Sequence, residues 1–106
     1  MGEKAVIVHR SAIAEWGSRK NPPLALSSIQ RALQKIDDVI KASKPEDIIL
    51  VEESPNTGFT YLPERVGVGN TARLYGARAS VCLRIARNVL EDAGIPVSLD
   101  NDGSLP

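Results

Sequence analysis

The sequence predicts a small α+β domain, a two-layer α/β sandwich in which two helices cover one face of a mostly antiparallel sheet. Its 106 residues suit one domain, and a hydrophobic content of 42% is enough for one core. Short β-branched runs alternate along the chain with two long stretches of helical periodicity. We expect residues 1–99 to form the domain and the polar residues 100–106 to form a flexible C-terminal tail.

The first half of the chain predicts a strand, a helix and a β-hairpin. The β-branched run at residues 5–8 predicts a strand, and residues 11–16 either extend it or form one helical turn. Apolar residues spaced by three and four from Leu26 to Ile40 form one stripe and predict a helix. The apolar run within residues 47–53 predicts a strand, which a loop of turn residues joins to a second strand at 59–62.

The second half predicts a longer helix between two strands. Residues 66–69 predict a short edge strand that follows a proline. Two neighbouring apolar stripes predict a helix from Thr71 to Ala93, with Gly94 as its stop signal, and residues 95–99 predict the last strand. The resulting order, β-α-β-β-α-β, is that of a ferredoxin-like arrangement.

The loop that opens this second helix is the candidate ligand-binding site. Two glycines allow close approach of a ligand to the backbone, two arginines flank the loop, and the free amides of a helix start attract anions. The phosphate-loop lysine and the third glycine of a dinucleotide fingerprint are both absent, and a plain bend between strand and helix is the alternative. The candidate residues are Arg65, Gly67, Gly69, Asn70, Thr71 and Arg73.

The predicted second helix carries an unusual run of arginines. Between Arg73 and Arg87 there are four arginines and no acidic residue. Three interpretations compete: a solvated face with salt bridges, a surface for an anionic ligand or nucleic-acid backbone, and a two-fold dimer. In the dimer, the arginine-rich end of one helix would face Glu91 and Asp92 of a second copy.

Neither catalysis nor metal binding is predicted. His9, the only histidine, stands at the end of the first predicted strand, and no second histidine or nucleophile-elbow pattern accompanies it. Cys82, the only cysteine, falls in the interior of the second predicted helix, where a free thiol is usually buried and inert. We therefore predict no catalytic residue, no metal ligand and no cofactor.

Charge and composition limit the partners. The chain has 13 basic and 13 acidic residues, and this zero net charge disfavours nucleic acid as a partner. A single cysteine and the lack of a signal peptide or a long apolar run indicate a cytoplasmic protein without a membrane partner. We expect a small binding or interaction module that forms homo-oligomers such as a homodimer. The alternatives are a protein or enzyme that binds a small anion such as phosphate through residues 65–73, and a weak nucleic-acid binder that uses the second helix.

Overall fold

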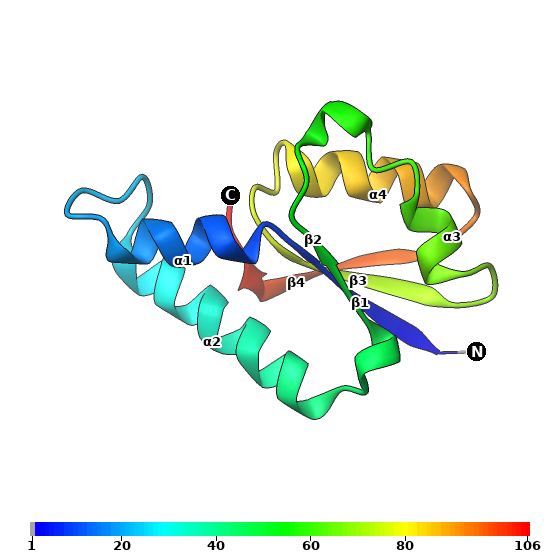
Figure 1. Cartoon of the computed structure of the whole chain (residues 1–106), viewed down its shortest axis with the longest axis horizontal. Helices are drawn as coiled ribbons and strands as arrows, with labels where there is room; N and C mark the ends of the chain where they lie inside the picture. Colours follow the sequence, from blue (N-terminus) through cyan, green and yellow to red (C-terminus); the bar gives the residue numbers. More distant parts are fainter. Residues whose placement is uncertain (1) are drawn as a thin grey trace.

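The structure, a computed structural model, describes residues 2–106 and contains one sheet of four parallel strands in the order β2-β1-β3-β4. The helices lie on both faces of this sheet, α1 and α2 on one and α3 and α4 on the other (Figure 1). The strands are β1 (Glu3–Val8), β2 (Ile48–Val51), β3 (Thr71–Gly76) and β4 (Val97–Ser104). The helices are α1 (Arg10–Ser18), α2 (Leu26–Ala42), α3 (Leu62–Val66) and α4 (Cys82–Asp92), with single 3-10 turns at Pro45–Asp47 and Pro55–Thr57.

The central strand β1 is apolar at successive positions because it is covered on both faces. Its side chains alternate between the faces, as in any strand. Ala5 and Ile7 pack in the core beneath α1 and α2, whereas Val6 and Val8 pack in the core beneath α3 and α4. Burial on both faces is the usual state of a parallel sheet, and it explains why β1 reads as a continuous β-branched run.

The predicted mostly antiparallel sheet with both helices on one face is wrong. No hairpin follows β2, because residues 59–61 form a turn that leads into α3. The edge strand predicted at residues 66–69 is also absent, since α3 ends at Val66 and a turn follows. The chain crosses from β2 past β1 to β3 through α3, so β3 runs parallel to β1.

The helix predicted from Thr71 to Ala93 is two elements, β3 and α4. Residues Thr71–Gly76 form a strand with parallel neighbours on both sides, and helix begins only at Cys82. Four of the last five residues of β3 are buried, because helices cover both of its faces. A strand buried in this way lacks the polar-apolar alternation that distinguishes strand from helix in a sequence.

Other expectations agree better with the structure. The strand at residues 5–8 and the helix from Leu26 to Ile40 are present as β1 and α2, and residues 11–16 are helical within α1. The C-terminal residues differ from expectation, since β4 continues to Ser104 and Leu105 is buried. The expected tail therefore contributes an edge strand and a core residue.

Candidate functional site

The carboxyl ends of β1 and β3 lie side by side at the centre of the sheet. From β1 the chain continues through α1 and α2 to β2 on one side, and from β3 it continues through α4 to β4 on the other. The two connections leave in opposite directions and on opposite faces of the sheet. Such a topological switch point is where open parallel sheets bind ligands, in the crevice outside the strand ends.

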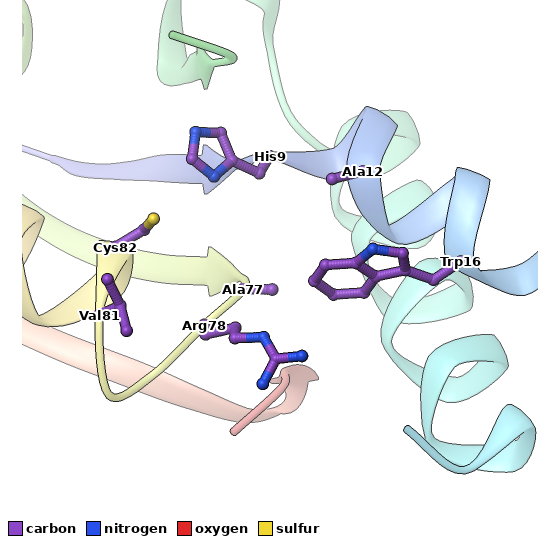
Figure 2. A pocket seen from close by; sticks show the side chains of 7 residues that line it. All are labelled: His9, Ala12, Trp16, Ala77, Arg78, Val81 and Cys82. Atoms are coloured by element: carbon purple, nitrogen blue, oxygen red, sulfur yellow. The ribbon is translucent and has the colours of Figure 1, made fainter. Parts of the chain in front are cut away.

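A pocket of about 190 Å³ lies at this switch point (Figure 2). Its walls come from the β1–α1 junction and the first turns of α1 on one side, and from the β3–α4 connection on the other. The wall is mostly apolar, with one guanidinium and one imidazole, and ligand pockets typically combine apolar walls with a few polar groups. The lining residues are His9, Ala12, Trp16, Ala77, Arg78, Val81 and Cys82.

Close backbone packing positions the β3 side of the pocket. Gly76 has a φ of 119°, and an added Cβ would lie 2.0 Å from the carbonyl oxygen of Val8 in β1. The amide of Ala77 donates to this same carbonyl at 3.2 Å, and the amide of Ala79 donates to the carbonyl of Leu105 at 2.7 Å. These contacts hold the β3–α4 connection against the ends of β1 and β4.

Arg78 supplies the positive charge of the pocket. Its guanidinium carbon lies 5.4 Å from the centroid of the Trp16 ring, a distance suited to a cation–π contact. The side chain is partly buried, yet within residues 2–106 it forms no ion pair and no side-chain hydrogen bond. Its five N–H donors are therefore available to an anion.

The imidazole of His9 is fixed in orientation. His9 adopts a left-handed backbone conformation with a φ of 57° immediately before α1, and its amide donates to the carbonyl of Val51 at 2.7 Å. Its ring packs edge-on against Phe59, with the ring centroids 6.2 Å apart. Ring nitrogen Nε2 lies 2.6 Å from the carbonyl oxygen of Glu53. The other nitrogen, Nδ1, lies on the side of the ring toward Cys82 and Ala77 (Figure 2).

Cys82 lies at the first residue of α4 and lines the pocket, with 9% of its surface exposed. The sequence places it in a helix interior, which is wrong because α4 starts eleven residues later than the predicted helix. In the described part of the chain the amides of Ser80, Cys82 and Arg84 have no hydrogen-bond acceptor. The positive end of α4 therefore adds to the charge of Arg78 on this side of the pocket.

Two glutamates follow β2 near the pocket, and both are engaged by other groups. The Glu52 carboxylate accepts hydrogen bonds from the hydroxyl of Ser11 and, at 3.3 Å, from its amide, in the first turn of α1. The hydroxyl of Tyr61 donates to the Glu53 carboxylate. Neither carboxylate lines the pocket, so no acidic side chain of the lining opposes Arg78.

The Tyr61–Glu53 contact has a measurable consequence at high pH. Burial and the Glu53 carboxylate together raise the pKa of Tyr61 to about 12. Because the folded-state pKa is the higher one, the contact stabilises the fold below about pH 10 and loses this effect as the pH rises toward 12. The difference between the absorbance titrations of wild type and Tyr61→Phe should show one phenolate step near pH 12. A difference step near the ordinary tyrosine pKa of about 10 would contradict this contact.

The candidate ligand-binding residues predicted from the sequence lie around the start of β3, at the opposite end of the strands from the pocket. Arg65 ends α3, Gly67 and Gly69 form the turn that follows, and Thr71 begins β3. The Asn70 side chain is occupied within the fold, since it donates to the carbonyl of Val66 at 2.7 Å and accepts from the amide of Gly2 at 2.9 Å. No helix starts here, so the free helix amides that motivated this site are absent. A ligand-binding role for this loop stays a prediction.

The predicted arginine-bearing helix is divided in the same way. Arg73 lies in β3 and forms an ion pair with Asp100 at 2.9 Å, and Arg78 precedes α4. Of the four arginines only Arg84 and Arg87 lie on α4, and Arg87 pairs with Glu91 of its own helix at 3.3 Å. The dimer contact based on one continuous arginine-rich helix is therefore wrong in its geometry. Homo-oligomerisation and nucleic-acid binding stay predictions.

The pocket residues were missed because the β3 strand was missed. With residues 71–76 read as a strand, the sequence would have placed His9 and Arg78 just beyond the carboxyl ends of two parallel strands. The usable signal was Gly76, since a glycine within a helical pattern is unfavourable and often marks close backbone approach.

No protein-family model, curated protein or solved structure matches this chain. Within residues 2–106, no group of three or more His, Cys, Asp or Glu side chains is arranged to hold a metal ion. The same stretch contains no helix of the length and apolarity needed to cross a membrane.

Proposed function

We propose that this chain binds a small anionic molecule that carries a flat ring, in the pocket between α1 and the β3–α4 connection. The observation that carries the proposal is Arg78, a partly buried guanidinium that lies over Trp16 in a mostly apolar pocket and has no acidic partner among residues 2–106. A partly buried cation is stabilised when an anion accepts hydrogen bonds from its N–H groups.

The two parts of the ligand would contact different parts of the pocket. The anionic group would lie on Arg78 near the start of α4, where backbone amides also point outward. The ring would contact the apolar wall that Trp16, Ala12 and Val81 provide. A volume of about 190 Å³ is smaller than the ~300–1,000 Å³ of pockets that enclose whole drug-sized ligands. The pocket therefore suits a single ring, and a larger ligand would extend out of it.

Tryptophan fluorescence tests this proposal directly, because Trp16 is the only tryptophan of the chain. Phenyl phosphate and benzenesulfonate provide a ring with an anionic group, and benzenesulfonamide provides the same ring without charge. We expect both anions to change Trp16 emission at lower concentrations than the neutral compound does. Absence of any response to the anions, together with unchanged thermal stability in their presence, would contradict the proposal.

Replacement of Arg78 should separate pocket binding from general charge attraction. Arg78→Ala removes the donors for the anion, and a charge-assisted hydrogen bond contributes about 1.5–3 kcal/mol, so the affinity should fall by roughly tenfold to a hundredfold. Arg84→Ala is the matched control, because it makes the same charge change at an exposed residue of α4 outside the pocket lining. Isothermal titration calorimetry should show wild-type affinity for this control. Equal losses in the two variants would show that the anion does not bind at Arg78.

A further inference from the structure

The tautomer of His9 follows from its contact with the backbone. Nε2 lies 2.6 Å from the carbonyl oxygen of Glu53, and a carbonyl oxygen only accepts hydrogen bonds. The Nε2 atom must therefore carry a hydrogen in both protonation states. In the neutral ring this leaves Nδ1 with a lone pair and no hydrogen.

Protonation reverses the interaction between Nδ1 and an anion in the pocket. Nδ1 lies on the pocket side of the ring, toward Cys82 and Ala77 (Figure 2). In the neutral ring its lone pair would face the anion and repel it. In the imidazolium the same atom is a charged N–H donor and attracts it. The contribution of His9 to anion binding therefore depends on its protonation more sharply than a change of net charge alone would require.

The carboxylates near His9 are hydrogen-bonded to other residues, so the partner of the Nδ1 atom would be a ligand. After β2, the Glu53 carboxylate attracts the imidazolium, but it already accepts a hydrogen bond from Tyr61. The Glu52 carboxylate accepts a hydrogen bond from Ser11 of α1. The side chains that line the pocket include no carboxylate. The titratable and charged groups that face His9 or these carboxylates are Glu52, Glu53, Tyr61, Arg65, Arg78 and Cys82.

We infer that His9 is a proton-dependent second anchor for the anion, so that ligand binding at this pocket takes up a proton and weakens as the pH rises. The inference rests on the proposed function, because it concerns the same pocket and the same anionic ligand. Linkage makes the effect reciprocal: protonation of the His9 ring favours anion binding, and a bound anion favours protonation of the ring to the same extent.

Calorimetry with benzenesulfonate tests this inference, because the charge of a sulfonate does not change between about pH 5.5 and 8.5 whereas histidine titrates in this interval. We expect the affinity to fall by about tenfold across it, the effect of losing one charge-assisted contact. Repeating the titration near pH 7 in buffers of different ionisation enthalpy should reveal net proton uptake. In His9→Asn the affinity should be lower at acid pH and nearly constant with pH. Asparagine is the chosen residue because it tolerates the left-handed backbone at this position.

A second readout on the wild-type protein does not depend on how the variant folds. His9 is the only histidine, so its two ring C–H signals report its titration in NMR spectra without overlap from another histidine. We expect benzenesulfonate to move the midpoint of this titration to higher pH. Binding that requires Arg78 but shows no pH dependence and no His9 shift would overturn the inference and leave the proposed function standing. Absence of binding at every pH would overturn both.

Discussion

Replacing Gly76 with alanine is expected to prevent the chain from reaching its native fold. The new Cβ would lie 2.0 Å from the Val8 carbonyl oxygen and 2.9 Å from the Val8 nitrogen, and these are backbone atoms of the central strand. The φ of 119° is in addition a conformation that residues with side chains rarely adopt. Relief of the clash would separate β1 from β3, at a cost that we expect to exceed about 4–5 kcal/mol, a large part of the stability of a small domain.

Gly69 offers a matched control for this prediction. It has a similar φ of 98°, but an added Cβ would meet no atom within 4 Å. Gly69→Ala should therefore show the cost of backbone strain alone, about 1–3 kcal/mol, and remain folded. Circular dichroism and urea unfolding distinguish the two variants. If Gly76→Ala unfolds at the same urea concentration as Gly69→Ala, the close contact between β1 and β3 is incorrect.

The second large effect is expected at Asp100, the carboxylate that ties β4 to β3. Asp100 is 4% exposed, and its Oδ2 atom accepts from the Nε atom of Arg73 at 3.0 Å. Its Oδ1 atom accepts from the amide of Gly103 at 2.8 Å, within the stretch of β4 where the register with β3 shifts. Asp100→Ala leaves a buried amide and a partly buried guanidinium without their acceptor, and we expect a loss of about 3 kcal/mol.

The Asp100 contacts also predict how stability changes with acid. Burial alone would raise the pKa of Asp100, but the Gly103 amide and the Arg73 guanidinium outweigh burial and lower it below its usual value. Because the folded-state pKa is the lower one, these contacts stabilise the fold above the unfolded pKa of about 3.9. The stabilisation is lost as the pH falls below about 4 and passes the folded-state pKa.

Urea unfolding of Asp100→Asn over this range checks the acid prediction. The difference in unfolding free energy between wild type and Asp100→Asn should be large at about pH 7 and should shrink below about pH 4. Asp37→Asn is a suitable control, because Asp37 pairs with Arg10 at 2.8 Å but both side chains are far more exposed than Asp100, at 38% for Arg10 and 43% for Asp37. Such pairs contribute about 0–1 kcal/mol. If the difference in unfolding free energy between wild type and Asp100→Asn stays constant from neutral to acid pH, the fold does not stabilise the ionised form of Asp100.

The α2 helix, which has one covered face, was predictable from the sequence, whereas the β3 strand, which is covered on both faces and precedes a helix, was not. The α2 helix buries Ile29, Ala32 and Ile36 and exposes its other side, so its spacing of apolar residues is clear. In β3, burial of Leu74, Tyr75 and Gly76 in succession removes the alternation of a strand. Its apolar residues then combine with those of α4 into one false helical pattern.

The C-terminal residues were misread for a different reason. Residues 100–106 are rich in Asp, Gly and Ser, a composition typical of exposed turns. Their order depends on long-range contacts, the ion pair of Asp100 with Arg73 and the hydrogen bond from the Leu105 amide to the Gly76 carbonyl at 2.8 Å. Such contacts join residues about thirty positions apart, and local composition carries no information about them.

The location of the candidate pocket was not predicted from the sequence. An anionic ligand held by arginine and helix-start amides was expected from the sequence, at the loop around Gly67 and Gly69. In the structure, Arg78 and the start of α4 lie at the carboxyl ends of the strands, beside His9 and Trp16. The parallel order of the strands decides this location, because it places the ends of β1 and β3 next to each other.

An amide NMR titration with benzenesulfonate shows most directly where the anion binds. We expect chemical-shift changes concentrated in the β1–α1 junction and the β3–α4 connection, at residues 9–16 and 77–82, together with the indole signal of Trp16. Arg78→Ala should remove most of these changes, and Arg84→Ala should preserve them. Changes concentrated at residues 65–73 would place the anion site at the loop predicted from sequence. That result, or an absence of changes anywhere, would contradict a ligand site at the switch point.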